Sequence, residues 1–338
     1  MDRRLFTTAL AAAFTAPVAC TGARVRDEQH VLLFAYFTTA NGSRKGLQLA
    51  ASDDGLTFRP LRDGASFLAP EVGESQLMRD PCLFKGPLDR DPYHLVWTTS
   101  WGGNTLGHAS SHDLIHWSAQ QAVPVMANYP GTRNVWAPEV IWDATSRRYV
   151  VFWSSTVPGM FDDSAGKSED DYNHRLFYTT TEDFRTFTPA MVLYDPGFSI
   201  IDGTFLTDAR GGLHLIIKDE RVDPVKKHLR ITAAASPVGP FGPLSEPFTG
   251  SWVEGPTAVR VGNDYLVYFD VYREHRYGAV RSTDLNHWED IGPRISMPPG
   301  ARHGTLLRVP RTLLAKIEAL HSSLSSTVRP ASKHSARG

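Results

Sequence analysis

Three acidic residues interrupt apolar stretches of this 338-residue chain, and each is followed at once by proline or glycine. Asp80 lies in the segment MRDPCLF, Asp202 in SIIDGTFL and Glu254 in SWVEGPTAV. A carboxylate within an apolar strand costs free energy unless it is paired or serves a purpose. General acid–base catalysis requires one carboxyl group that is protonated and another that is ionised. We therefore take these three residues as candidate catalytic groups.

Such a set of carboxyl groups suits the cleavage of a glycosidic bond. In an inverting reaction one carboxyl group protonates the leaving oxygen while another activates water, and the two groups lie about 6.5–9.5 Å apart. A third carboxylate can raise the pKa of the proton donor by like-charge repulsion. The sequence has no Ser-His-Asp order, phosphate-binding loop or Cys/His metal-site spacing that would favour another chemistry.

A short pattern that recurs along the chain indicates which elements position the acids. An aspartate precedes an aromatic residue by four positions at Asp54/Phe58, Asp113/Trp117, Asp183/Phe187 and Asp284/Trp288. Each copy follows a run such as YHLVWTTS or DYLVYFDVY that is typical of β-strands, and a degenerate fifth copy is SPVGPF. We interpret these aspartates as turn residues without a chemical role. Five repeats of about four short strands predict an all-β fold, a five-bladed β-propeller, with the three acids at the same position of their repeats.

The remaining composition bounds the location and partners of the protein. A net charge of −1 gives no reason to expect a nucleic-acid partner or binding to a charged membrane surface, and two cysteines are too few for a disulfide scaffold. Residues 1–20 predict an export signal, because RRLF resembles a twin-arginine motif and Cys20 ends a lipoprotein-like cleavage box. We expect an exported protein: a periplasmic or outer-membrane lipoprotein held only by a lipid on Cys20, or a secreted one.

The three segments together resemble glycoside hydrolase family 43, five-bladed propeller enzymes that act on arabinose-, xylose- and galactose-containing glycans. RDPCLF, IDGTFL and EGPTAV match the family's motifs in order and spacing, and VWAPEVIWD and ARHGTLL match two further segments. The resemblance covers residues 30–309 and implies that Asp80 is the general base, Asp202 the pKa modulator and Glu254 the general acid. It implies inversion on an oligo- or polysaccharide with no required cofactor. It also implies a structural Ca²⁺ on the propeller axis, bound through water near His303.

Six further side chains are candidate substrate contacts, because they are aromatic or charged groups beside these motifs or in the long inserts. We expect Arg79 to brace Asp80, and we expect His174 to lie at the rim of the pocket. A structural role in the core, at a strand end or in a solvated loop is the alternative for each. The candidates are Arg79, Trp101, Trp136, Glu139, His174 and Arg273.

The inserts MANYPGTRN and FDDSAGKSEDDYNHR surround the third repeat and are expected to crowd one side of the pocket, which favours exo action. We expect an α-L-arabinofuranosidase. The alternatives are a β-D-xylosidase or an exo-β-1,3-galactosidase of the same family and, in another class, a non-catalytic carbohydrate-binding propeller. A fructan hydrolase is disfavoured because its Asn-Asp-Pro and Glu-Cys motifs are missing. Residues 310–338, outside the propeller, are expected to form a short helix and a disordered basic tail.

Overall fold

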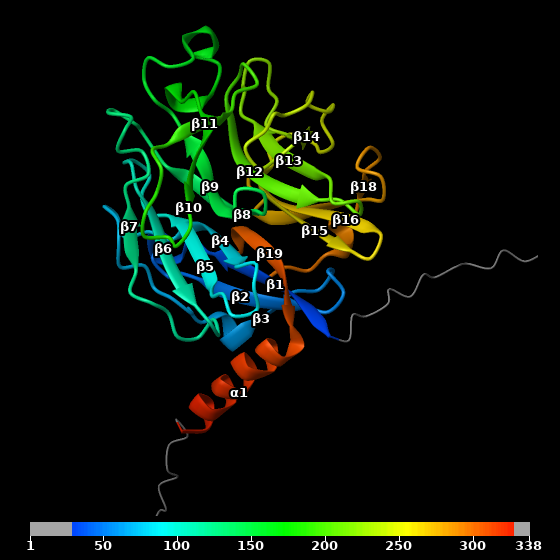
Figure 1. The fold of residues 1–338 in the computed structure, drawn as a ribbon. Helices are drawn as coiled ribbons and strands as arrows, with labels where there is room; N and C mark the ends of the chain where they lie inside the picture. The colour runs from blue at the N-terminus through cyan, green and yellow to red at the C-terminus, as the bar shows by residue number, and fades with distance from the viewer. Residues whose placement is uncertain (1–28, 328–338) are drawn as a thin grey trace, which may run out of the picture.

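Five antiparallel sheets surround one axis in the computed structural model, which describes residues 29–327 (Figure 1). This arrangement confirms the predicted all-β, five-bladed propeller. The predicted export signal and residues 328–338 of the predicted tail lie outside the described residues. Within residues 29–327, no helix is both long enough and apolar enough to cross a lipid bilayer.

Each blade is a meander whose first strand lies nearest the axis, except that the innermost strand of blade 1 is the last strand of the chain. Blade 1 contains β19 (Arg302–Pro310), β1 (His30–Phe37), β2 (Gln48–Ser52) and β3 (Arg59–Pro60). Blade 2 contains β4 (Arg79–Lys85), β5 (Tyr93–Thr98), β6 (Leu106–Ser111) and β7 (Gln121–Val123). Blade 3 contains β8 (Trp136–Asp143), β9 (Arg148–Ser155), β10 (Arg175–Thr181) and β11 (Met191–Tyr194).

Blade 4 has three strands and blade 5 again has four. Blade 4 contains β12 (Ile200–Thr207), β13 (Leu213–Asp219) and β14 (Leu229–Ala234). Blade 5 contains β15 (Glu254–Val261), β16 (Asp264–Val271), β17 (Arg276–Ser282) and β18 (Glu289–Asp290). The ring closes in blade 1, where β1 pairs with β19 from His30↔Pro310 onward.

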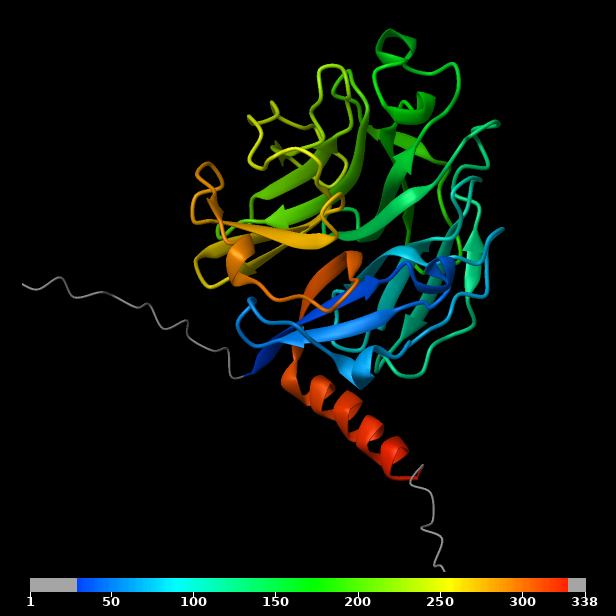
Figure 2. The same cartoon turned by 180° about the vertical axis from the view of Figure 1, so that it is seen from behind.

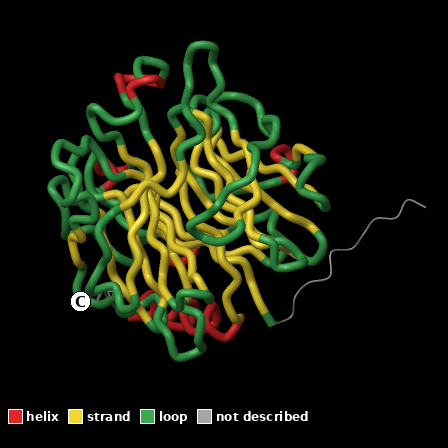
Figure 3. The backbone as a smooth tube through the Cα atoms, turned by 45° about the horizontal axis from the view of Figure 1, so that its top comes forward, coloured by secondary structure: helices red, strands yellow, loops and turns green. Residues whose placement is uncertain are grey.

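Strands fill the interior of the molecule, and loops and turns surround them (Figure 3). Apolar clusters join neighbouring blades: Leu33 of blade 1 and Trp97 of blade 2, both fully buried, belong to one such cluster. The helix α1 (Arg311–Thr327) follows β19 directly (Figure 2). Its Leu313 and Ile317 side chains belong to the same cluster.

The recurring aspartates hold tight turns, as predicted. Asp54 Oδ1 accepts hydrogen bonds from the backbone N–H groups of Leu56 (2.7 Å) and Thr57 (3.0 Å). Asp113, Asp183 and Asp284 accept the equivalent pairs of backbone hydrogen bonds in their own repeats. These side chains replace backbone partners at the turn and lie away from the axis, so they define the architecture.

A β-bulge interrupts the strand pairing near the start of every innermost strand. The bulge residue has a positive φ in four blades: 50° at Asp80, 48° at Ala137, 55° at Asp202 and 59° at Gly255. Proline or glycine follows each of them, which explains the acid-Pro/Gly pattern of the sequence. Glu254 therefore lies one residue before the bulge, opposite Asp270. The expectation that the three acids share one position was wrong, because Asp80 and Asp202 are bulge residues and Glu254 is not.

Candidate active site

Asp80 is the second residue of β4 and is held by hydroxyl and imidazole groups. Thr98 Oγ1 donates a hydrogen bond to Asp80 Oδ2 (2.9 Å), and the same hydroxyl oxygen accepts one from the backbone N–H of Ala137 (2.9 Å). His303 Nδ1, from β19, lies 3.5 Å from Asp80 Oδ1. Three blades thus fix the carboxylate, and its side chain keeps 11% of its surface exposed, enough to meet a small ligand or water.

Asp202, on blade 4, is buried and forms hydrogen bonds with blades 3 and 5. Its backbone N–H donates to Ser154 Oγ (3.1 Å), and its Oδ2 accepts from the backbone N–H of Gly255 (2.9 Å). Burial is the main cause that raises the pKa of Asp202 to about 6. The negative charges of Glu254 and Asp80 act in the same direction, whereas nearby cations oppose them. These mutual effects place all three predicted catalytic acids at one end of the axis, which we call the acidic end.

Glu254 begins β15 and is about three-quarters buried. Lys218 Nζ, at the end of β13, donates to Glu254 Oε2 at 3.3 Å. Burial alone would raise the pKa of Glu254, but the positive charges of Lys218, His303 and Arg79 hold that pKa below its usual value. The three acids therefore differ in environment although they are neighbours.

Polar residues on the second strands tie each blade to the next at the acidic end. All four are buried, and each is the first polar residue after an apolar run of its strand. The contacts are Thr98 with Ala137 N (2.9 Å), Ser154 with Asp202 N (3.1 Å), Lys218 with Glu254 (3.3 Å) and Asp270 with Arg302 (2.9 Å). These four residues were not among the candidates predicted from the sequence. The change from apolar to polar at the strand end was the signal that could have found them.

Asp270 is a fourth carboxyl group at the acidic end. It faces Glu254 across β15 and β16, and its Oδ2 lies 2.9 Å from Arg302 Nε. Burial raises the pKa of Asp270 to about 7, with Arg302 opposing and Glu254 adding to the shift. Asp270 therefore adds negative charge beside Glu254 whenever it is ionised.

Aromatic rings form one wall of the acidic end. Trp101 is 57% exposed, and the Arg79 guanidinium lies 4.2 Å from the centroid of its ring. Trp136 Nε1 donates to the Trp101 carbonyl oxygen (3.0 Å), and the two rings lie 5.9 Å apart. Tyr172, which the sequence analysis did not single out, lies 4.8 Å from Trp136. Exposed, flat rings of this kind are suited to stacking on sugars.

Two of the predicted substrate contacts, His174 and Arg273, have other surroundings in the structure. His174 is 1% exposed, behind the rings of Tyr172 and Trp136, so the prediction that it lies at the rim was wrong. Burial lowers its pKa to about 3. Arg273 is exposed and stacks on Trp252, with its guanidinium carbon 3.0 Å from the ring centroid, so its contact with substrate stays a prediction.

Glu139 lies deeper along the axis. It lines a cavity of about 320 Å³, which we call the axial cavity, and the other lining residues come from the innermost strands of all five blades. Thr204 Oγ1 (3.2 Å) and Thr305 Oγ1 (3.4 Å) contact its two carboxyl oxygens, and burial raises its pKa to about 8. Glu139 therefore does not line the acidic end, and the prediction that it contacts substrate does not fit its position.

The donors near His303 do not form a calcium site. Ca²⁺ takes six to eight oxygen ligands in proteins. Among residues 29–327, no group of three or more His, Cys, Asp or Glu side chains is arranged to hold a metal ion. The His303 ring instead faces Asp80. These residues do not fit an ion with protein ligands, and an ion bound through water stays a prediction.

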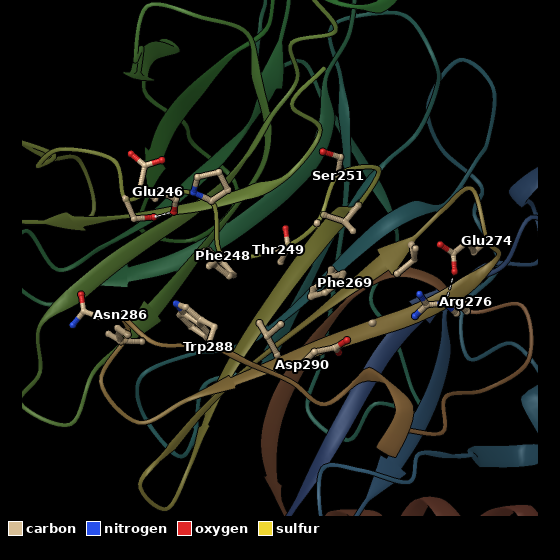
Figure 4. Close-up of a pocket in the computed structure, with 18 residues that line it drawn as sticks. Glu246, Phe248, Thr249, Ser251, Phe269, Glu274, Arg276, Asn286, Trp288 and Asp290 are labelled. Carbon is tan, nitrogen blue, oxygen red and sulfur yellow. Dashed lines mark hydrogen bonds and ion pairs between the residues drawn. The ribbon is translucent and has the colours of Figure 1, made fainter. Parts of the chain in front are cut away.

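A larger pocket of about 870 Å³ lies between blades 4 and 5 and contains none of the predicted site residues (Figure 4). Phe248 and Trp288 stack 4.6 Å apart on one side of it. Its carboxylates, Glu246, Glu274 and Asp290, come from three separate segments, and Glu274 is paired with Arg276 (2.7 Å). Size alone therefore does not mark the chemical site of this propeller.

Known proteins resemble this chain in sequence and fold. A protein-family model described as a probable glycosyl hydrolase domain, related to glycoside hydrolase family 43, matches residues 27–313. An alpha-L-arabinofuranosidase of Bifidobacterium longum subsp. longum is 23% identical over 282 residues, 71% of this chain and 26% of that protein. The chain thus spans about a quarter of the length of this curated relative.

Solved structures share the fold at low identity. A thermostable family-43 glycoside hydrolase has a TM-score of 0.53 at 16% identity, over 68% of this chain and 82% of its own. An alpha-L-arabinofuranosidase from Lactobacillus brevis has 0.51 at 14%, over 63% and 72%. An endo-arabinase from Bacteroides thetaiotaomicron has 0.52 at 15%, over 72% and 97%.

Proposed function

Because this chain belongs to the family of probable glycosyl hydrolase domains related to glycoside hydrolase family 43, we propose that it hydrolyses glycosidic bonds with inversion at the acidic end. The observation that carries the proposal is the convergence of Asp80, Asp202 and Glu254 from three blades. Each has a different partner, because Thr98 donates to Asp80, the backbone N–H of Gly255 to Asp202, and Lys218 to Glu254.

Asp80 is the general base in this proposal. Thr98 already donates to its Oδ2, so we assign the proton taken from water to Oδ1. The His303 imidazole beside Oδ1 keeps the carboxylate oriented towards the axis. A base held by two neighbours loses little conformational entropy on reaction, which is how positioning lowers a barrier.

Glu254 is the general acid and Asp202 sets its state. Asp202 Oδ2 holds the backbone N–H directly after Glu254, so it fixes the start of β15. Repulsion between the two carboxylates is mutual, and it favours a proton on Glu254 when Asp202 is ionised. We expect the carboxyl groups of Asp80 and Glu254 to lie about 6.5–9.5 Å apart, with room for one water molecule.

We propose an α-L-arabinofuranoside as the substrate, with a β-D-xyloside or a β-1,3-galactoside as the alternatives. The name of the Bifidobacterium relative supports the first choice. Tyr172 belongs to the insert FDDSAGKSEDDYNHR, which we call the acidic insert, and its ring beside Trp136 closes one side of the acidic end. Arg133 donates to the Asp171 carbonyl oxygen (2.8 Å) and holds the same insert in place. A wall of this kind favours removal of terminal sugars over binding in the middle of a polysaccharide.

The same proposal includes export, because a polysaccharide substrate lies outside the cell. The signal-like residues 1–20 support it, with the lipid on Cys20. Metabolic labelling with palmitate in the native host should mark the wild type and not Cys20→Ala. Labelling of both proteins, or of neither, would contradict lipidation, and cell fractionation would then separate secretion from retention.

Hydrolysis of aryl glycosides and plant oligosaccharides, followed by proton NMR of the released anomer, tests the function. Wild type should release one sugar with inversion, and Asp80→Asn and Glu254→Gln should each lower kcat by about 10²–10⁴-fold. Release with retention would contradict the roles of both acids. Sugar binding without hydrolysis of any substrate would favour the non-catalytic propeller.

A further inference from the structure

Lys218 is buried between two carboxylates that compete for it. Its Nζ lies 3.0 Å from Glu220 Oε2 and 3.3 Å from Glu254 Oε2, and it faces the Tyr272 ring at 4.9 Å. A buried ammonium group is stable only when it is paired and hydrogen-bonded. Burial alone would lower the pKa of Lys218, but Glu220 and then Glu254 raise it well above its ordinary value. The lysine therefore stays charged, and its charge is shared.

The pairing continues away from Glu254 as a ladder of alternating charges. Lys227 is fully buried, and its Nζ donates to Glu220 Oε1 (2.7 Å) and to Glu169 Oε2 (3.0 Å). Glu169 lies in the short 3₁₀ segment Glu169–Asp171 of the acidic insert, with half of its side chain exposed. We call Glu254, Lys218, Glu220, Lys227 and Glu169 the charge ladder.

We propose that Lys218 is the positioning residue of Glu254 and that Glu220 limits how strongly Lys218 holds it. This inference rests on the proposed role of Glu254 as the general acid. A lysine paired with Glu254 alone would keep that carboxyl group ionised, and an ionised group cannot donate a proton to a leaving oxygen. Glu220 lies closer to the ammonium group than Glu254 does, so it draws the lysine's charge towards itself.

Other charged groups also face Glu254, and they remain in place in the variants below. They act in both directions: cations lower its pKa, whereas carboxylates raise it. They are Arg79 on β4, Asp202 on β12, Asp270 on β16 with its partner Arg302, Tyr272 after β16, Tyr277 on β17 and His303 on β19. A change in the titration of Glu254 on altering the charge ladder therefore reports on the ladder.

Two substitutions should move the titration of Glu254 in opposite directions. Lys218→Met removes the cation and leaves Glu220 paired with Lys227, so the pKa of Glu254 should rise by about 1–3 units. Glu220→Gln removes the competitor and leaves Lys227 paired with Glu169, so Lys218 should turn to Glu254 and lower its pKa. The basic limb of the kcat/KM profile reports the loss of the protonated acid, and it should move in the same directions.

The experiment compares pH profiles of kcat/KM for wild type, Lys218→Met, Glu220→Gln and the control Lys226→Met. Lys226 carries the same charge and lies next to Lys227, between β13 and β14, but it is not part of the charge ladder. Its backbone N–H donates to the Arg221 carbonyl oxygen. The control should keep the wild-type profile. Shifts of equal sign in the two test variants, or none, would overturn the inference. Thermal unfolding confirms the fold of each variant; should Lys218→Met fail to fold, Glu220→Gln decides alone, since an unchanged or raised limb contradicts it.

A second readout separates this inference from the proposed function. The Glu254 carboxyl carbon can be titrated by ¹³C NMR, with its resonance assigned by Glu254→Gln, and this needs no turnover. If no glycoside is hydrolysed but the titration rises in Lys218→Met and falls in Glu220→Gln, the ladder stands and the proposed function falls. If hydrolysis is inverting and the titration does not respond, the function stands and the ladder falls.

Discussion

Glu139→Gln should stabilise the protein at alkaline pH, because the axial cavity holds Glu139 in its neutral form. The Thr305 hydroxyl lies 3.1 Å from the Pro81 carbonyl oxygen and 3.4 Å from Glu139 Oε1. One hydroxyl proton cannot serve both oxygens. If Glu139 is protonated, its O–H donates to Thr305, and the Thr305 proton goes to Pro81. A glutamine NH₂ group can make the same donation.

The magnitude follows from the difference in pKa between the folded and the unfolded chain. Burial raises the pKa of Glu139 from 4.5 to about 8 in the folded protein. The folded state thus keeps a proton that the unfolded chain releases, so stability falls as pH rises from about 4.5 and the loss is complete above about 8. At 1.36 kcal/mol per pKa unit, the full loss is on the order of 5 kcal/mol.

Urea unfolding at pH 5, 7 and 9, followed by tryptophan fluorescence, measures this difference. Glu139→Gln should match wild type most closely at pH 5 and exceed it increasingly towards pH 9. Glu274→Gln, which neutralises an exposed carboxylate paired with Arg276, is the control and should show no such trend. A stability difference between Glu139→Gln and wild type that is constant across these pH values would refute a neutral Glu139.

Further predictions concern the bulges, the proposed base Asp80 and a buried imidazole. Gly255→Ala would place a Cβ 2.4 Å from the Cγ atom of His303 at φ 59°, so it should lower the free energy of unfolding by about 1–3 kcal/mol in urea titrations; an unchanged midpoint would contradict the bulge geometry. Thr98→Val should lower kcat/KM about 10-fold or more by removing a charge-assisted hydrogen bond to Asp80, while Thr98→Ser should retain activity; equal kinetics would exclude this role. Burial lowers the pKa of His108 to about 3, so the folded state resists a proton that the unfolded chain takes up. Stability should therefore be full above about pH 6.5 and fall towards pH 3. His108→Phe should flatten that fall in Tm measurements, and an unchanged fall would mean that the imidazole is solvated.

The sequence predicts the parts of this molecule that depend on neighbours along the chain. The turn aspartates and the acid-Pro/Gly segments are local signals, and they were sufficient for the five blades and for the three acids. The offset of Glu254 is not local, because it depends on how β15 pairs with β16. Lys218 was missed for the same reason: its partner Glu254 lies 36 residues away, on the next blade. The burial of His174 likewise depends on rings that the fold brings over it.

The order of the strands has a consequence for the chemistry. Asp80, the proposed base, belongs to blade 2, but the imidazole beside it, His303, belongs to β19, which pairs with β1 at the other end of the chain. Arg302, the partner of Asp270, lies on the same strand. The acidic end is therefore complete only after the last strand has closed the ring. The same strand that completes the sheet of blade 1 also supplies a neighbour to Asp80 and a counter-charge to Asp270 beside Glu254, so closure of the ring and assembly of the acidic end depend on one set of contacts.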